Sequence, residues 1–326
     1  MTTLSDLAAR LGVSKSTVSR SFSRPESVGA ATRERVLALA AELGYSPDPT
    51  ARSLATGRTH AVGVLVPDLA NPVHSVSVKS ARATAFGRGS TLLVADREEQ
   101  EADDSSTIAA LSRRVDGLVL VLPRLSDAGL LGVAAATPTV LVHRDVTGIP
   151  GVTASSEAAL DDAVAHLARL GHRRIAYLAG PRDTLPGVER RLAVTASAAR
   201  HGLDLTELGP YAPRLDEGLR AGADVLATTA TAALAYNDLI AVGLYRGLAD
   251  AGVRVGVDLS VIGHDGIWAA DYLEPPLATV RLPADRIVST AIDLLHDLIS
   301  GTGTRADLVR LDCSFTAARS AAIAPR

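Results

Sequence analysis

Short apolar runs alternate with helical patterns along most of the chain, beginning at Ala61. The runs with strand character are Ala61–Val66, Thr91–Ala95, Gly117–Leu122, Thr139–His143, Ile175–Ala179, Ala232–Tyr236, Ser260–His264 and Ala278–Arg281. Continuous apolar runs separated by helices are typical of parallel strands that are covered on both faces. So many strands favour two sheets over one oversized sheet. We therefore predict an α/β fold in which doubly wound parallel sheets form two lobes.

The segment before this alternation has the pattern of a small all-α bundle. Leu4–Leu11 is predicted to be a helix because its apolar residues recur at positions i, i+3, i+4 and i+7. Thr3 and Asp6 are spaced as a helix-start box requires, and Gly12 follows the last apolar position as a stop. The sequence thus defines both ends of the first helix.

A second helix is predicted over Lys15–Phe22, with Ser14 as its cap and with Val18 and Phe22 facing inward. Its exposed side chains would be Lys15, Ser16, Ser19 and Arg20. Two helices joined by a tight glycine-containing turn, the second with small polar and basic side chains outward, are typical of a helix-turn-helix that reads DNA. Helices this short need a third helix to enclose a core, and Thr32–Leu43 is predicted to supply it.

Positive charge is concentrated at the N-terminal end. Residues 1–60 carry eight Lys and Arg against five Asp and Glu, a net charge of +3, whereas the whole chain has a net charge of −3, which leaves −6 for the remainder. A basic head on an acidic body attracts phosphates at one end and repels DNA elsewhere. The charge distribution therefore supports DNA binding by the N-terminal helices.

Other features of the sequence disfavour membrane and secreted proteins. No stretch approaches the roughly 20 apolar residues of a membrane span. Asp6 and Arg10 interrupt the only apolar face near the N-terminus, so no signal sequence is predicted. The single cysteine, Cys313, excludes an internal disulfide and fits a reducing compartment. We expect a cytoplasmic, nucleoid-associated protein.

The sequence holds no constellation typical of an enzyme. The eight histidines are scattered without a pair at metal-ligand spacing. No glycine-rich phosphate loop follows the first strand, and no serine stands in a glycine-flanked nucleophile turn. We predict no catalytic activity, no cofactor and no metal site. A solute-binding protein, for which residues 60–326 would suffice, is the distant alternative, and the N-terminal helices disfavour it.

Eight segments, in order along nearly the whole chain, carry a family resemblance. They are TLSDLAARLGVSKSTVSRSF, TRERVLALAAELGYSPDPTARSLATGRT, VGVLVPDLANP, RRVDGLVL, LGHRRIAYLAGP, YNDLIAVGLYRGLADAGVRV, LSVIGHDG and PPLATVRLP. Together they resemble the lactose/galactose-repressor (LacI-type) family of bacterial transcription regulators. The resemblance implies a DNA-binding head, a hinge helix and a two-lobed body of periplasmic-binding-protein architecture.

The implied domains divide the chain into three parts. The head would cover residues 1–46, the hinge helix and linker 47–59, and the effector-binding and dimerisation body 60–326. Crossings between lobes are expected near Gly148–Thr153, Leu282–Pro283 and Leu308–Leu311. Lobe 1 would then comprise about 60–150 and 282–308, and lobe 2 about 151–281 and 309–326.

Head and hinge residues are predicted to contact DNA. Lys15, Ser16 and Arg20 would meet base edges in the major groove, and Arg20 is expected to be the strongest contact because arginine pairs bidentately with guanine. Phosphate-contacting or positioning roles are predicted for Thr17, Ser19 and Tyr45. The whole predicted DNA-binding set is Thr3, Ser5, Lys15, Ser16, Thr17, Ser19, Arg20, Tyr45, Ala51, Leu54 and Ala55.

The hinge contains an exposed apolar residue, Leu54. Thr50–Thr56 is long enough for about two helical turns, which is too short for an isolated helix in water, so it should fold only against its two-fold mate and DNA. The resemblance implies that Leu54 inserts at the central step of the operator minor groove, where apolar wedges kink the duplex. The alternative is that Leu54 packs on the head.

The resemblance also implies an effector pocket at the carboxyl ends of the strands. Its main ligand contacts would be Arg190, Asn237 and Asp265, which suit the recognition of hydroxyl groups. The alternatives are a helix-surface ion pair for Arg190, a helix cap for Asn237 and a turn for Asp265. The whole predicted effector-binding set is Asn71, His74, Arg144, Arg190, Asn237, Asp265 and Trp268.

Several pocket positions depart from the family pattern. The aromatic pair that often follows Asn-Pro in the family is replaced by Val73 and His74. Where the family has a serine four residues before the ligand arginine, this sequence has Pro186. Where the family has a second aspartate directly after Asp265, this sequence has Gly266. Trp268 is either a replacement stacking surface or a structural side chain. These departures bear on the effector and leave the DNA-binding prediction intact.

We therefore predict a sequence-specific DNA-binding regulator, a homodimeric repressor of a pseudo-palindromic operator. A small-molecule effector would control it, with a sugar or sugar derivative favoured. The alternatives are a nucleoside, another polyol or no ligand. The expected partners are double-stranded operator DNA, the effector and a second copy of the chain, and no membrane.

Overall fold

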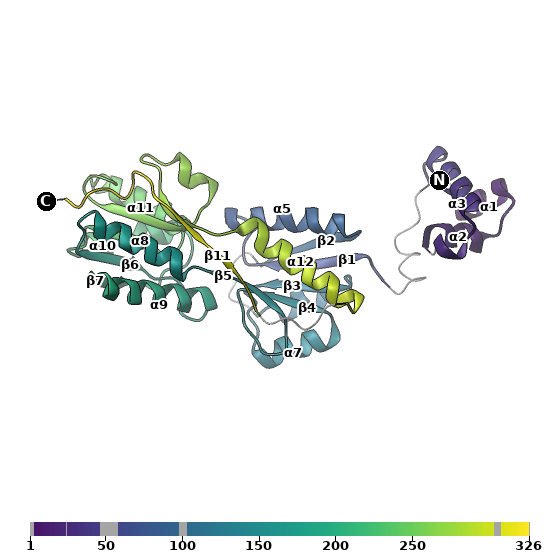
Figure 1. The fold of residues 1–326 in the computed structure, drawn as a ribbon, viewed down its shortest axis with the longest axis horizontal. Helices are drawn as coiled ribbons and strands as arrows, with labels where there is room; N and C mark the ends of the chain where they lie inside the picture. The colour runs from purple at the N-terminus through teal and green to yellow at the C-terminus, as the bar shows by residue number, and fades with distance from the viewer. Residues whose placement is uncertain (1–2, 24, 46–57, 98–102, 303–307, 326) are drawn as a thin grey trace. The chain divides into compact units, whose positions relative to one another are not determined.

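Two compact units make up the computed structural model, which describes residues 3–23, 25–45, 58–97, 103–302 and 308–325 (Figure 1). One unit is Met1–Ala61 with Arg114–Asp116, and the other is Val62–Arg113 with Gly117–Arg326. The first unit contains the three N-terminal helices, and the second contains two sheets with their flanking helices.

The N-terminal helices form a small bundle, here called the head. Its elements are α1 (Leu4–Leu11), α2 (Lys15–Ser23), the 3-10 turn η1 (Pro25–Ser27) and α3 (Ala30–Glu42). The buried core of the head consists of Leu7, Ala8, Val18, Val36 and Ala40. All three helices contribute to this core, as expected for helices too short to be stable alone. The predicted all-α head is therefore confirmed.

Local sequence sets the helix ends in the head. Thr3 Oγ1 accepts a hydrogen bond from the backbone N of Asp6 (3.3 Å), and the Asp6 carboxylate accepts one from the backbone N of Thr3 (2.8 Å). These two bonds confirm the predicted capping box. Gly12 follows with a φ of 65°, in the left-handed region that favours glycine. Helix α3 begins two residues earlier than predicted, because Ala30 and Ala31 are strong helix formers.

The second unit, here called the body, contains two six-stranded sheets within the described residues. The strands of the first sheet are β1 (Ala61–Val66), β2 (Thr91–Asp96), β3 (Gly117–Val121), β4 (Thr139–Val142), β5 (Gly151–Ser155) and β11 (Val309–Asp312). The strands of the second sheet are β6 (Arg174–Leu178), β7 (Asp204–Leu208), β8 (Ala232–Ala235), β9 (Ser260–Asp265), β10 (Ala278–Arg281) and β12 (Ser314–Thr316).

Strand order and direction follow the doubly wound pattern. The first sheet has the order β11-β5-β4-β3-β1-β2 and the second β12-β10-β9-β8-β6-β7. Pairing is parallel from β11 through β1 in the first sheet and from β10 through β7 in the second. The predicted α/β fold is confirmed. One strand differs, because β12 runs antiparallel to β10 at the edge of the second sheet, with Phe315 opposite Val280.

Helices cover both faces of the second sheet. One face carries α8 (Glu157–Arg169) and α9 (Leu185–Arg200), and the other carries α10 (Leu215–Leu226) and α11 (Asp238–Asp250). Ile175 and Tyr177 of β6 pack on the α8 side. Ala176 and Leu178 pack on the α11 side. Because successive side chains of a strand point to opposite faces, a doubly covered strand needs an unbroken apolar run.

The first sheet is covered in the same way. Its helices are α5 (Pro72–Gly87), α6 (Ser105–Ser112), α7 (Asp127–Ala136) and α12 (Ala284–Ser300). Helices α5 and α12 pack together on the face that includes Val62 and Val64, and α7 lies on the opposite side of the sheet (Figure 1). Each sheet with its helices forms one lobe, lobe 1 around the first sheet and lobe 2 around the second.

The lobe boundaries differ from the predicted ones. The sequence placed residues 151–281 and 309–326 in lobe 2, but β5 and β11 belong to the first sheet, where Val309 pairs with Val152. The chain therefore crosses between lobes at Ser156 and Cys313, in addition to the predicted Leu282–Pro283. Gly148 and Pro150, which predicted a crossing before β5, instead belong to a tight turn within lobe 1 that is closed by a bridge between Val146 and Ile149.

Candidate functional site

The outer face of α2 has the composition expected of a DNA-reading helix. Its exposed side chains are Lys15, Ser16 and Arg20. Val18, on the inner face, is fully buried. Ser14 holds the start of the helix, because its Oγ accepts a hydrogen bond from the backbone N of Thr17 (3.0 Å) and bonds to Ser16 Oγ (2.7 Å). Capping and packing thus fix the polar face of α2 relative to the rest of the head.

The other residues predicted to contact DNA have mixed exposure. Thr3 is exposed, and the half-buried ones are Ser5, Thr17, Ser19 and Tyr45. The Tyr45 ring packs on the core with its centroid 5.9 Å from that of Phe22. Ala51, Leu54 and Ala55 lie outside the described residues.

Arg190 and Asp265 form an ion pair inside the body. Arg190 belongs to α9 and Asp265 ends β9, and Arg190 Nη2 lies 3.2 Å from Asp265 Oδ1. Both side chains are buried, with exposed fractions of 8% and 7%. Arg190 Nη1 also donates to the carbonyl of Tyr236 (2.7 Å), and its guanidinium lies 4.7 Å from the centre of the Tyr236 ring. The fold brings these two predicted ligand contacts together, and they neutralise each other.

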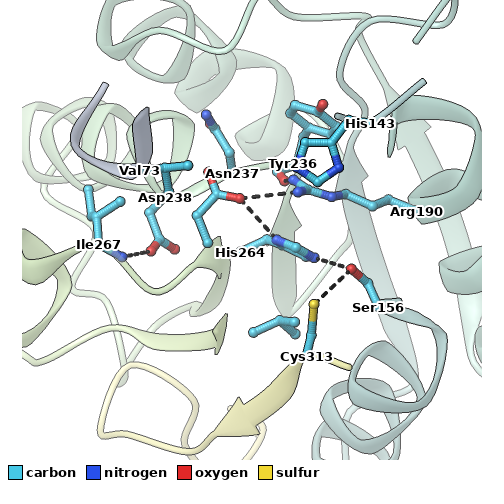
Figure 2. A network of polar contacts seen from close by, with 12 residues as sticks. Val73, His143, Ser156, Arg190, Tyr236, Asn237, Asp238, His264, Ile267 and Cys313 are labelled. Carbon is cyan, nitrogen blue, oxygen red and sulfur yellow. Dashed lines mark hydrogen bonds and ion pairs between the residues drawn. The ribbon is translucent and has the colours of Figure 1, made fainter. Parts of the chain in front are cut away.

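His264 extends this pair into a chain of hydrogen bonds (Figure 2). Its Nδ1 lies 3.1 Å from Asp265 Oδ1, and its Nε2 lies 3.0 Å from Ser156 Oγ. Burial and the Arg190 charge lower the pKa of His264 to about 4, so the ring is neutral at pH 7. A neutral ring that donates from Nδ1 to the carboxylate must accept at Nε2. Ser156 Oγ therefore donates to Nε2, and Cys313 Sγ lies 3.4 Å from Ser156 Oγ.

The hydrogen-bonded series that begins at Arg190 ends at Ser156 and Cys313, where the backbone crosses between the lobes. Ser156 follows β5, and Cys313 separates β11 from β12. The Cys313 backbone N also donates to the carbonyl of Ser155 (2.9 Å). The Arg190–Asp265 pair is thus connected through His264 to two of the three crossing segments.

The pKa values of two buried carboxyl groups near Arg190, those of Asp265 and Asp238, are shifted in opposite directions. Burial alone would raise the pKa of Asp265, but Arg190 and His264 hold it below its usual value. Burial, reinforced by the Asp265 charge, raises the pKa of Asp238 to about 8. Asp238 accepts hydrogen bonds from Thr279 Oγ1 (2.7 Å) and from the backbone N of Ile267 (2.8 Å). At neutral pH the region therefore holds one ionised and one largely protonated carboxyl group.

Two predicted effector residues act as helix caps. Asn237 is 1% exposed, and its Oδ1 accepts a hydrogen bond from the backbone N of Ile240 (3.0 Å) at the start of α11. Asn71 Oδ1 accepts one from the backbone N of Val73 (3.1 Å) at the start of α5. The helix-cap alternative for Asn237 is therefore present in the structure.

The remaining predicted effector residues lie in different surroundings. His74 is buried, which lowers its pKa. Trp268 is 65% exposed and meets the Tyr272 ring edge-on, with centroids 6.3 Å apart. Asp265 and Trp268 both border a small cavity of about 140 Å³.

Arg190, Asp265, Tyr236, His264 and Ser156 are here called the Arg190 cluster. A larger cavity, of about 740 Å³, lies next to this cluster and shares Tyr236 with it. Arg144 is the one residue of the predicted effector set that borders this cavity. Three further arginines border it, Arg97, Arg124 and Arg214. We call it the arginine cavity.

Backbone strain marks residues beside these cavities. Asp265 has a φ of 115° and His143, which borders the arginine cavity, has a φ of 58°. Such values are uncommon for residues other than glycine and are concentrated at functional sites. His143 Nδ1 lies 3.1 Å from Thr153 Oγ1, and burial together with the Arg190 charge lowers the pKa of His143 to about 3. His143 is therefore a neutral wall of the cavity.

Sequence reasoning missed most of the arginine cavity. Arg97 directly follows β2, Arg124 follows β3 and Tyr236 follows β8. The carboxyl ends of parallel strands meet at one edge of a sheet, so the polar residues just after each strand were the available signal.

The described residues contain neither a metal-binding arrangement nor a membrane-spanning helix. No group of three or more His, Cys, Asp or Glu side chains there is placed to hold a metal ion. Within the same residues, no helix has the length and apolar character needed to cross a membrane.

Two sequence profiles match the chain. Residues 3–48 match the profile "Bacterial regulatory proteins, lacI family", and residues 164–320 match that of a periplasmic binding protein-like domain. These ranges cover the head and much of lobe 2.

Curated proteins and solved structures are similar over almost the full length. The HTH-type transcriptional repressor CytR of Escherichia coli (strain K12) is 30% identical over 323 residues, which cover 96% of this chain and 94% of CytR. The ribose operon repressor of the same strain is 32% identical over 308 residues, covering 90% and 92%. A crystal structure of the Lac repressor dimer bound to operator and the anti-inducer ONPF superposes with a TM-score of 0.87 at 29% identity, covering 98% of this chain and 99% of that one.

Proposed function

Because this chain belongs to the lacI family of bacterial regulatory proteins, we propose that it is a homodimeric repressor of a pseudo-palindromic operator, controlled by a small molecule bound in the body. The observation that carries the proposal is the fixed, exposed polar face of α2 in a chain whose body encloses a ligand-sized cavity. Similarity to two transcriptional repressors and to an operator-bound dimer supports it. Such a regulator would act on DNA in the cytoplasm.

Each part of the chain has a proposed task. The head, residues 1–46, would read the major groove, and two heads on a two-fold axis would require two half-sites at a fixed spacing. Residues 47–59 would form the hinge, with Leu54 as the wedge in the minor groove. The body, residues 60–326, would dimerise and bind the effector. Lobe closure around the effector would shift the two hinges apart, provided that the effector binds one lobe arrangement better than the other.

The reading role of α2 is tested by changing Arg20 to Ala. Loss of a bidentate guanine contact should cost about 1–3 kcal/mol on the selected operator and relax specificity at one base pair. The measurement is an electrophoretic titration against the operator and against random DNA of equal length. Arg10, exposed on α1, provides the matched control, since Arg10→Ala removes the same charge without a predicted base contact. Equal losses on both DNAs for Arg20→Ala would make Arg20 a phosphate contact.

The wedge role is tested by Leu54→Ala. Folding and dimerisation should be retained, while operator bending and specific affinity fall and the remaining binding becomes more salt-sensitive. A circular-permutation assay measures the bend. An unchanged bend with unchanged affinity contradicts the proposal and favours packing of Leu54 on the head.

The effector is proposed to be a sugar or sugar derivative, contacted by Arg190, Asn237 and Asp265. These side chains supply the donors and acceptors that hydroxyl groups need. A ligand would have to compete with the partners that all three have in this structure. Nucleosides and other polyols belong in the same thermal-shift screen of wild type and Asp265→Ala. A compound that stabilises both proteins equally would exclude Asp265 as an essential contact.

A further inference from the structure

The arginine cavity has a border rich in hydrogen-bond donors. Four arginines border it, of which Arg97 is paired with the buried Asp104, and two carboxylates, Asp103 and Asp183, border it as well, in a chain with a net charge of −3. A guanidinium group only donates, and its planar fork matches the oxygens of a phosphate or carboxylate. This composition differs from a site for a neutral polyol, whose hydroxyl groups need acceptors as well as donors.

Arg97 is the fixed member of the set. Its Nη1 donates to both carboxylate oxygens of Asp104 (3.2 and 3.0 Å) and to the carbonyl of Leu122 (3.1 Å). The Arg97 side chain is 7% exposed, and its Nε has no acceptor among the described residues. A buried donor without an acceptor costs about 1–3 kcal/mol. Because Asp104 meets its charge and its Nε is enclosed, Arg97 is a fixed part of the cavity wall and is not assigned to the ligand.

Arg144 and Arg214 have partners that a ligand can displace. Arg144 Nη2 lies 2.7 Å from Asp127 Oδ1, and Arg214 Nε lies 3.4 Å from Asp216 Oδ1. The two carboxylate side chains are 63% and 66% exposed. Exposed pairs of this kind contribute about 0–1 kcal/mol, so exchanging the carboxylate for a ligand anion costs little.

Three helices begin at the same cavity. Ser126 caps α7, Thr184 caps α9 and Arg214 precedes α10, and all three residues border the cavity. The N-terminus of a helix carries partial positive charge and free backbone N–H groups. At α10 the Arg214 side chain makes no capping hydrogen bond, so no side chain at this N-cap competes for those groups. The helix ends add to the arginine charge.

The two bordering carboxylates do not offset this arrangement. Asp103 keeps its charge, because a hydrogen bond from the backbone N of Ser105 (2.6 Å) favours the ionised form, but its side chain is exposed and solvent screens that charge. Asp183 is exposed to solvent. Arg190 and Asp265 neutralise each other and add no net charge.

We infer that the ligand of the arginine cavity is an anion, a small organic molecule whose phosphate or carboxylate group is held by Arg124, Arg144 and Arg214. The volume of about 740 Å³ leaves room for an organic part beyond the anionic group. The inference rests on the proposed function, because it names the chemical class of the effector.

The first experiment uses inorganic phosphate as the probe. The thermal transition of the full chain is followed in increasing phosphate, with chloride added to hold the ionic strength constant, for wild type, Arg124→Gln and Arg214→Gln. Each variant should weaken the phosphate response about tenfold, the loss expected for one charge-assisted hydrogen bond. Arg246→Gln is the matched control, since Arg246 is 75% exposed on α11 and pairs with Asp250 away from the cavity. An equal response in all four proteins overturns the inference.

The second experiment separates the two anionic groups and the organic part. Ribose, ribose 5-phosphate and ribonate are titrated calorimetrically into the full chain. Tighter binding of either anion than of ribose, lost in Arg214→Gln, supports the inference and identifies the group. Binding of ribose as tight as that of both anions overturns it.

Operator binding by wild type, measured in parallel, separates this inference from the proposed function. Absent operator binding with an arginine-dependent phosphate response contradicts the repressor and leaves the anion site standing. Specific operator binding with no such response contradicts the anion site alone.

Discussion

The Arg190 cluster and the arginine cavity share Tyr236 but use arginine in opposite ways. Arg190 is buried, and its charge is met by Asp265 and by a backbone carbonyl. Among the described residues, Arg144 and Arg214 pair with well-exposed carboxylates. The buried ion pair on one side of the binding region therefore stabilises the fold, whereas the arginines on the other side can exchange their exposed partners for a ligand anion.

The energetic scale of the two regions follows from burial. Removing one partner of a buried ion pair leaves an uncompensated charge and costs about 3–5 kcal/mol. Removing one partner of an exposed pair costs about 0–1 kcal/mol. Substitutions in the Arg190 cluster should therefore change stability first, and substitutions around the arginine cavity should change binding first.

The largest effect is expected from Asp265→Ala. Arg190 would remain buried without its counterion, so the free energy of unfolding of lobe 2 should fall by about 3–5 kcal/mol. Trp268, the single tryptophan, lies in lobe 2, so its fluorescence in urea follows that lobe. Asp250→Ala, which removes an exposed carboxylate paired with Arg246, is the control. If both variants lose the same stability, the contrast between the regions is wrong.

A smaller effect is expected from pH acting on Asp238. An unfolded aspartate has a pKa of about 3.9, and the folded pKa is about 8, so between these values the folded chain holds one more proton. Raising the pH through this window therefore favours unfolding. Asp238→Asn can keep both hydrogen bonds, because the Thr279 hydroxyl can accept as well as donate. The stability of wild type relative to this variant should fall between pH 5 and pH 8, and parallel urea curves at every pH would exclude a protonated Asp238.

His264 should make the fold less stable as the pH falls, whereas Asp238 makes it less stable as the pH rises. Its pKa is about 4 in the folded chain and about 6.5 when unfolded, so the unfolded chain binds a proton first as the pH falls. Wild type should therefore lose stability between about pH 6.5 and pH 4, and His264→Gln should lose less over that window. His201→Gln, at a half-buried histidine outside the cluster, is the matched control. Identical acid transitions for wild type and His264→Gln would mean that folding does not lower the pKa of His264.

The smallest effect on stability is expected at the arginine cavity. Asp127→Asn removes the exposed partner of Arg144 and should change the free energy of unfolding by less than about 1 kcal/mol. The same change removes a competitor for the guanidinium, so phosphate affinity should rise by a few-fold. Phosphate titration followed by thermal shift measures both quantities in one experiment. A large loss of stability would place Asp127 with the buried cluster.

The head and the alternation of strands with helices could be predicted from the spacing of residues within short stretches of sequence. The Thr3–Asp6 box, the Gly12 stop and the unbroken apolar runs each depend on residues only a few positions apart. The same holds for the Asn237 cap, which sequence reasoning offered as an alternative. These features need no knowledge of how the sheets are ordered.

The polar contacts of the Arg190 cluster could not be predicted without knowledge of the tertiary fold. His264, Ser156 and Cys313 meet although 157 positions separate the last two. The arginines of the cavity come from the ends of different strands and from two lobes, so their convergence depends on sheet order. The crossing at Ser156 was misplaced for the same reason, since only pairing with β4 and β11 assigns β5 to the first sheet.

The adjacency of β11 and β12 has a consequence for biosynthesis. Among the described residues these strands, separated by Cys313 alone, are the last strand of each sheet in chain order, so neither sheet is complete until residue 316 has been made. A nascent or prematurely terminated chain that stops at residue 308 would present two unpaired edges, one along β5 and one along β10. Open edges of this kind pair with other chains. We expect such a truncated chain to aggregate, which size-exclusion chromatography would reveal, whereas a monodisperse product would show that each sheet tolerates the loss of its final strand.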